Sequence, residues 1–402
     1  MTATKMPADA AGSTPGVGAT EPPPLVRGSQ DAAVEAQETA TSARVTTRAM
    51  HRPVADVALA LAWVPFVLGA RVLQGMNAGQ GDLALLAVFV SAVFLLSFAH
   101  QPLTMALVYG DPEQFRLRRA IFTVSPFIFM VAVGVGFYVS FAIVALVGGL
   151  WNAEHTLMQR YGVTRIYGRM VGQDDGLVEK LMLFSWLIAA ALWVAADPST
   201  PARAASLPLG ENNQLAIDWL VRLRPIAFAL WVPAMIAVVA LAVRWVLDER
   251  RRPTVNPMKW VYLGSTATLF LVMVIDPLAG IMGYVGAHAL EYFVIVHQSL
   301  GKRYGADAGA PDGAGGTAPG RGPLIGRAVR ARTGRIGFLA VYVAIIIGIV
   351  MVLERAGSRL AYIVVFFTLG GLHVFYDGFI WKLRRPAVAR SLSIPSAGTS
   401  SA

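Results

Sequence analysis

Long apolar stretches alternate with short polar ones from residue 53 onward, and this alternation predicts the fold. Each stretch reaches the roughly 20 residues that an α-helix needs to cross a bilayer. Two stretches are about twice that length, and breaks near Gly134–Tyr138 and at Asp276–Pro277 would divide each into two helices. The pattern predicts an all-α integral membrane protein, a polytopic bundle of about ten transmembrane helices. The expected spans are 54–73, 83–108, two within 121–159, 177–196, 225–247, two within 260–300, 336–353 and 360–381.

Three segments lack this apolar pattern. Residues 1–52 are rich in Ala, Thr, Pro and Gly, and no basic segment leads into a short apolar core as in a signal peptide. We predict that they form a disordered cytoplasmic tail. The transmembrane domain then covers residues 53–385 and includes a Gly/Ala/Pro/Arg-rich cytoplasmic linker at 303–334. Residues 386–402 are predicted to be a second disordered tail.

Composition and charge agree with a membrane protein. The 402 residues are 55% hydrophobic and 14% charged, whereas soluble domains carry about 25% charged residues. Lys and Arg gather in alternate loops, and the positive-inside rule then places both termini in the cytoplasm. The formal charge of +10 follows from this asymmetry and calls for no nucleic-acid partner. The absence of cysteine excludes disulfides, thiolate catalysis and Fe–S clusters.

Five of the six histidines fall in predicted spans, and all four of those spans are expected to run from outside to inside. His100 lies eleven residues before Asp111, His155 ten before Arg165 and His373 nine before Lys382, which puts each roughly 13–17 Å below the inner interface. Acidic residues follow His288 and His373 at helical spacings of three and four, which puts each pair on one helix face. The candidate metal ligands are His100, His155, His288, Glu291, His373 and Asp377, with Glu154 and His297 as further candidates.

Ionisable groups at this depth are costly, so each is a functional hypothesis. Neutral imidazole binds iron, copper and zinc well, and carboxylates either bind the metal or orient its ligands. We therefore predict a transition metal, iron in first place, with zinc, copper or haem b as alternatives. For each histidine taken alone, a hydrogen bond between helices is the competing explanation.

Arg160, Tyr161 and Arg165 are expected where helices meet the cytoplasmic headgroups. They are candidates for binding an anionic headgroup or substrate phosphate. An ordinary basic and aromatic anchor at the interface explains the same residues. A similar string follows His155 ("HTLMQRYG") and His297 ("HQSLGKRYG"), which suggests a weak internal repeat of a helix pair.

Three functions fit these observations. The first is a metal-dependent oxidoreductase that acts on a lipid-soluble substrate and takes electrons from a donor protein at the cytoplasmic face. In layout it resembles the membrane di-iron desaturases and hydroxylases, although their HxxxH and HxxHH boxes are absent. The second is a haem-b cytochrome in which His100 pairs with His155, or His288 with His373. The third is a transporter or proton-coupled pump with a His/Glu/Asp relay.

Overall fold

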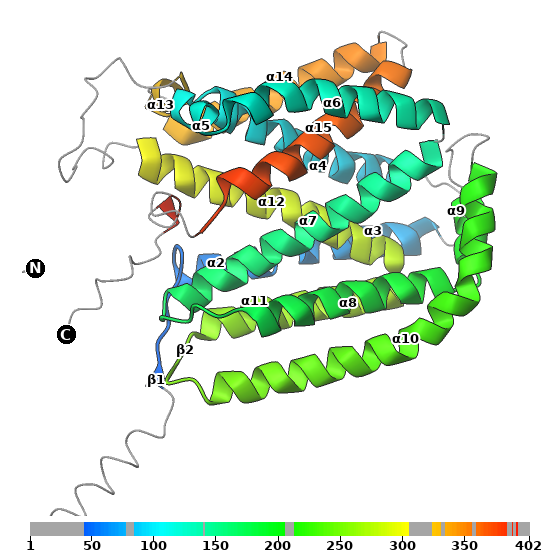
Figure 1. The fold of residues 1–402 in the computed structure, drawn as a ribbon, viewed down its shortest axis with the longest axis horizontal. Coiled ribbons are helices and arrows are strands. Elements are labelled where there is room, and N and C mark those ends of the chain that lie inside the picture. The colour runs from blue at the N-terminus through cyan, green and yellow to red at the C-terminus, as the bar shows by residue number, and fades with distance from the viewer. Residues whose placement is uncertain are drawn as a thin grey trace, which may run out of the picture. The chain divides into compact units, whose positions relative to one another are not determined.

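The part of the chain that the structure describes is almost entirely helical, and its long helices lie side by side (Figure 1). The computed structural model describes residues 44–77, 84–139, 141–205, 213–304, 324–330, 334–355, 359–383, 388, 391 and 392. In chain order the elements are β1 (Arg44–Val45), α2 (Pro53–Ala60), α3 (Val64–Asn77), α4 (Ala84–Tyr109), α5 (Pro112–Leu117), α6 (Arg119–Val139), α7 (Phe141–Arg169), α8 (Leu177–Ala196), α9 (Thr200–Ala205), α10 (Asn213–Arg250), β2 (Thr254–Val255), α11 (Pro257–Ile275), α12 (Pro277–Tyr304), α13 (Leu324–Val329), α14 (Gly334–Arg355) and α15 (Arg359–Ile380).

Among these residues, nine helical segments are long and apolar enough to cross a membrane, with α2 and α3 counted together as one. The prediction of an all-α polytopic membrane protein is therefore confirmed. A further long helix, α7, has 29 residues and corresponds to the fourth predicted span. The Asp276–Pro277 break is found where it was expected. The other break falls between Val139 and Phe141, because the helix continues through Gly134 and Gly136.

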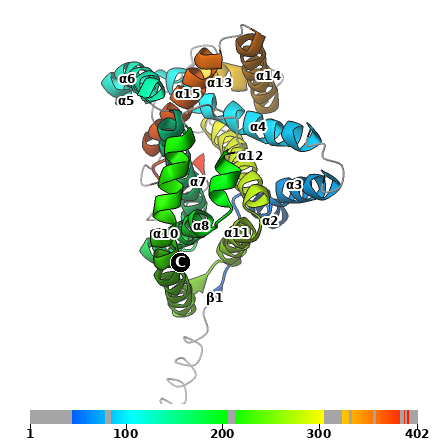
Figure 2. The same cartoon turned by 90° about the vertical axis from the view of Figure 1, so that its right-hand side faces the viewer.

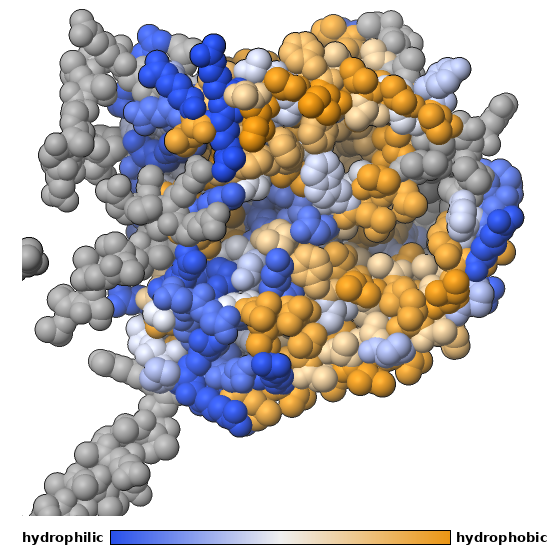
Figure 3. Space-filling model, in the orientation of Figure 1, coloured by the Kyte–Doolittle hydropathy of each residue, from blue (hydrophilic) through white to orange (hydrophobic). Residues whose placement is uncertain are grey.

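The helices differ greatly in how far the protein covers them. Seen end-on, α12 lies among α4, α7 and α11, whereas α6, α10 and α14 lie at the outside (Figure 2). Within the apolar window of each span, 78% of α12 is buried but only 6% of α10. The outer helices present hydrophobic side chains (Figure 3). Such a surface fits lipid, because the helices satisfy their own backbone hydrogen bonds.

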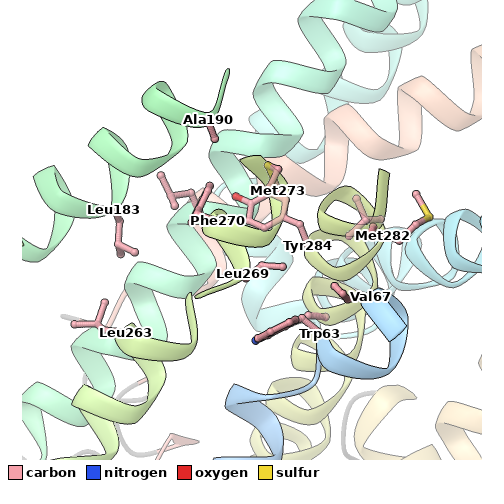
Figure 4. Packing of buried hydrophobic residues seen from close by; sticks show 14 of the residues in the cluster. Trp63, Val67, Leu183, Ala190, Leu263, Leu269, Phe270, Met273, Met282 and Tyr284 are labelled. Atoms are coloured by element: carbon pink, nitrogen blue, oxygen red, sulfur yellow. The ribbon is translucent and has the colours of Figure 1, made fainter. Parts of the chain in front are cut away.

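Close packing holds the α3–α11–α12 part of the core together (Figure 4). Trp63 and Val67 contact the same buried cluster as Leu269 of α11 and Met282 of α12. A Cβ atom on Gly280 would overlap the backbone of Met273. Glycine at this position therefore allows α11 and α12 to approach closely after their turn.

The helices α4, α7, α12 and α15 run in one direction, as the sequence predicts. Their C-terminal ends lie at the end of the bundle that carries β1 and β2 (Figure 1). Hydrophilic side chains gather at this end (Figure 3). We call it the polar end. All the intramembrane histidines belong to these four helices.

The described structure includes residues 44–52, which the sequence assigns to the N-terminal tail. β1 pairs in parallel with β2. The backbone N–H of Met50 donates to the Asp56 carboxylate at 2.7 Å, and Met50 itself is buried. The N–H of His51 donates to the other oxygen of the same carboxylate at 3.2 Å. Residues 44–52 are thus attached to the start of α2.

Two other predicted loop segments also contain packed residues. Ile325 and Val329 of α13, inside the expected linker, are buried against the C-terminal ends of α4 and α12. Val388 and Leu392 of the expected tail are buried in a cluster with Met50. Residues 1–43, 305–323 and 393–402 lie outside the described residues, so disorder there stays a prediction.

Candidate metal centre

Four imidazole rings from four helices meet inside the bundle. They belong to His100 of α4, His155 of α7, His288 of α12 and His373 of α15, and each residue is at most 8% exposed. The ring centroid of His100 lies 4.6 Å from that of His288 and 4.7 Å from that of His373. The His155 centroid lies 4.8 Å from that of His373 and 5.2 Å from that of His288. The four predicted histidines therefore form one cluster, which we call the histidine cluster.

The nitrogen positions within the cluster match those of ligands that share an ion. His373 Nε2 lies 3.2 Å from His100 Nε2 and 3.1 Å from His155 Nε2. Two nitrogens that bind one ion at about 2.0–2.1 Å, at octahedral or tetrahedral angles, lie roughly 2.8–3.4 Å apart. The two separations fall in this range.

Asp377 and Thr104 orient the central ring. The Thr104 hydroxyl donates to Asp377 Oδ1 at 2.9 Å and lies 2.7 Å from His373 Nδ1. Because the hydroxyl hydrogen points to Asp377, the Nδ1–H of His373 donates to the Thr104 oxygen. In that tautomer the lone pair of His373 Nε2 faces the Nε2 atoms of His100 and His155, both at hydrogen-bond distance. A partner on the outer nitrogen that fixes the tautomer in this way is usual for metal-bound histidine.

The Asp377 carboxylate has two different sides. Oδ1 accepts hydrogen bonds from Thr104 and, at 3.1 Å, from the Tyr292 hydroxyl. Oδ2 faces the imidazoles, 3.6 Å from His155 Nε2 and 3.8 Å from His373 Nε2. One oxygen is thus held by the protein while the other is directed toward the histidine cluster.

His288 is the least satisfied member of the cluster. Both of its ring nitrogens are buried, and neither has a hydrogen-bond partner among the described residues. A buried imidazole without any partner is rare and calls for an explanation. A bound ion would supply one.

Two sets of side chains in the described part of the chain bring three ligand atoms within 4.8 Å of one another. They are His100, His288 and His373, and His155, His373 and Asp377. All five residues are buried, and His373 belongs to both sets. Nitrogen-rich sites with one carboxylate suit iron, copper or zinc rather than magnesium or calcium.

Glu291 does not join the histidine cluster. Its carboxylate pairs with the Arg160 guanidinium at 3.0 Å and accepts hydrogen bonds from Tyr262 and Gln159 at 2.9 and 3.2 Å. Arg160 is fully buried and also donates to Thr266 at 3.0 Å. We call these five residues the Arg160–Glu291 network. One helical turn on α12 therefore separates a residue of the cluster, His288, from a residue of the network.

The predicted headgroup residues are largely occupied by the protein. Arg160 lies nine residues before the end of α7, so it is well inside the bundle rather than at its surface. Arg165 is 4% exposed and donates to the Asp175 carbonyl at 2.7 Å. Tyr161 is half-buried against the hydrophobic core. The two arginines are thus not presented to a headgroup, because α7 extends further than the sequence pattern suggests.

Glu154 and His297 lie outside the two ligand sets. Glu154 is half-buried and lines a cavity next to His155. His297 follows His288 by nine residues, so it points from another side of α12, and its backbone carbonyl accepts from Arg335. The repeat strings therefore do not place equivalent residues together, because His155 is in the cluster and His297 is not.

A cavity of about 390 Å³ adjoins the cluster, and His155 and Asp377 form part of its wall. Most of its other lining residues are apolar and come from α7, α12 and α15. It connects one side of the histidine cluster with the space between α7 and α15. The cluster therefore has one side open to a molecule.

Tyr292 is a cluster contact that sequence reasoning missed. It follows His288 by four residues and so lies on the same helix face. That spacing was the available signal, but a tyrosine in an apolar helix usually only packs against its neighbours.

No family model, curated protein or solved structure matches this chain.

Proposed function

We propose that this protein is an integral membrane metal-dependent oxidoreductase that acts on a lipid-soluble substrate. The observation that carries the proposal is the convergence of His100, His155, His288, His373 and Asp377 beside an apolar cavity. His288 adds support because its buried nitrogens have no partner in the described protein. Iron suits the donor set, with copper and zinc as the other metals that imidazole and carboxylate bind well.

The residues of the site would have different roles. The imidazoles would hold the ion, and Thr104 and Tyr292 would keep Asp377 and His373 in place. An iron ion held by histidine and carboxylate, with an open coordination position, supplies redox chemistry with dioxygen. The wall formed by His155 and Asp377 is where a substrate in the cavity would meet the site.

The geometry favours a metal ion over haem b. The pairs considered as haem ligands are His100 with His155 and His288 with His373. The rings of His100 and His155 each contact both His288 and His373 edge to face, so each pair is in contact with the rings of the other. Two axial ligands of a haem lie on opposite faces of a flat macrocycle. The contacts between these rings leave no layer for such a group.

Metal analysis of the purified protein tests this function. We expect wild-type protein to retain a transition metal and His373→Ala to lose it while the amount of folded protein stays similar. The loss of affinity should exceed the about 10- to 100-fold cost of losing an outer partner. His297→Ala is the matched control and should keep its metal. Wild-type protein without metal but active in solute flux across liposomes would favour the transporter instead.

We also infer that the polar end of the bundle faces the cytoplasm, where an electron donor protein would dock. The basic residues near this end support that orientation under the positive-inside rule. Reporter fusions after Gly210 and Gly316 should report the outside and the cytoplasm, respectively. The reverse pattern would place the site in the outer half of the membrane.

A further inference from the structure

The cavity beside the histidine cluster has the size and walls of a ligand pocket. Its volume of about 390 Å³ lies within the roughly 300–1,000 Å³ typical of small-molecule sites. The polar side chains in its wall are those of Glu154, His155, Gln159, Tyr292, Asp377 and Lys382. Elsewhere the wall is apolar, and its main apolar residues are Trp151, Met158, Val163, Ile295, Val374 and Trp381.

The position of the cavity indicates how a ligand would reach it. It lies where α7 and α15 face each other, with α12 contributing Tyr292 and Ile295. The face between α7 and α15 is hollowed, and hydrophilic side chains are visible in the hollow between hydrophobic surfaces (Figure 3). Among the surrounding helices, α12 and α15 are long and apolar enough to cross a membrane, and α7 corresponds to a predicted span, so this opening would meet lipid chains.

We propose that this cavity binds one long hydrocarbon chain that enters from the bilayer between α7 and α15 and lies beside His155 and Asp377. This assignment rests on the proposed function, since it names the substrate class and the binding site of that reaction. An apolar wall stabilises such a chain by burial. His155 and Asp377, the two lining residues that belong to the candidate ligand sets, mark the part of the wall where the chain would meet the metal.

Two glycines give the cavity its room. Gly162 of α7 and Gly378 of α15 both line it, and a Cβ atom added at either position would meet no other atom within 4 Å. A larger side chain at either glycine would therefore enter the cavity without a clash at its first carbon. These positions determine how wide a chain the site accepts.

Photo-labelling with a diazirine derivative of a long-chain fatty alcohol tests the assignment in membranes that contain the full-length protein. We expect labelled peptides from 151–166 and 374–383, in addition to the lipid-facing helix α10. In Gly162→Leu and Gly378→Leu, labelling of the pocket should fall about 10-fold, equivalent to about 1.4 kcal/mol. Labelling of α10 in the same sample serves as the internal reference.

Gly149→Leu is the matched control, because Gly149 also lies on α7 with open space around its Cβ position but does not line the cavity. It should leave pocket labelling unchanged. Equal labelling of the pocket peptides in wild type and both cavity variants would overturn the assignment. Metal content, measured on the same samples, separates the two proposals. Bound metal without pocket labelling would refute only the hydrocarbon site. Pocket labelling without bound metal would refute only the proposed metal-dependent activity.

Discussion

The Arg160–Glu291 network and the histidine cluster lie one helical turn apart on α12, and they differ in how their polar atoms are paired. In the Arg160–Glu291 network a cation and an anion pair at 3.0 Å, and Tyr262 and Gln159 donate to the remaining carboxylate oxygen. In the histidine cluster four imidazoles face one another, and both nitrogens of His288 lack a partner in the described protein. The network pairs its two opposite charges within the protein, although Arg160 Nε has no hydrogen-bond partner in the described residues, whereas no described side chain partners either ring nitrogen of His288.

This difference separates a structural role from a functional one at the same depth. A buried ion pair with good geometry can offset the cost of removing both charges from water. It therefore ties α7, α11 and α12 together without any ligand. A buried nitrogen without a hydrogen-bond partner lowers stability, and we infer that the two ring nitrogens of His288 are kept for an ion.

Breaking the network should produce the largest effect on folding. Glu291→Leu leaves Arg160 buried without its anion, which should lower the free energy of unfolding by about 3–5 kcal/mol. Thermal unfolding of the protein in detergent measures the change. Combining Arg160→Met with Glu291→Leu should recover most of the loss, because both charges are then removed.

The same variants show whether Glu291 belongs to the metal site. We expect the double variant to retain its metal, since Glu291 contacts Arg160, Tyr262 and Gln159 rather than the imidazoles. Loss of metal from Glu291→Leu with unchanged unfolding behaviour would mean that Glu291 is a ligand. The contrast between cluster and network would then fail.

Removing the Thr104 hydroxyl should have a smaller effect on folding and a clear effect on metal binding. Thr104→Val keeps the shape but removes the link between Asp377 and His373 Nδ1. We expect about 10- to 100-fold weaker metal binding and a loss of about 1–3 kcal/mol of stability. A metal titration of the apo-protein, followed by thermal unfolding, measures both.

Thr268→Val is the matched control for this substitution. Thr268 lies on α11, away from the cluster, and its hydroxyl donates to the Gly264 carbonyl at 3.0 Å on an exposed surface. It should leave metal affinity unchanged and shift stability by less than about 0.5 kcal/mol. Equal loss of metal in the two threonine variants would show that the Thr104 link does not orient the ligands.

Hydropathy and helical spacing predicted the bundle and the four histidines of the cluster. Both signals are local, since a span is a run of apolar residues and depth follows from the rise per residue. The spacing of His373 and Asp377 also correctly placed both on one helix face. Residues 44–52 were missed because β1 and Met50 are ordered by contacts with β2 and Asp56 rather than by an apolar period of their own.

The partner of Glu291 could not be predicted from the same spacing argument. His288 and Glu291 lie three residues apart, and helical geometry alone puts both toward the bundle interior. His288 and Glu291 belong to different groups because α7 places Arg160 opposite Glu291 and His155 opposite His288. The packing of the helices against one another decides which residues meet, and the sequence of a single helix does not determine that packing.

X-ray absorption spectroscopy at the metal edge of the purified wild-type protein tests the central claim most directly. The histidine cluster predicts one bound transition metal with several nitrogen ligands at about 2.0–2.1 Å and the scattering pattern of imidazole rings. The nitrogen signal should disappear in His373→Ala and persist in His297→Ala. A protein without bound metal, or a metal surrounded by oxygen alone, would contradict the claim that these four histidines hold an ion.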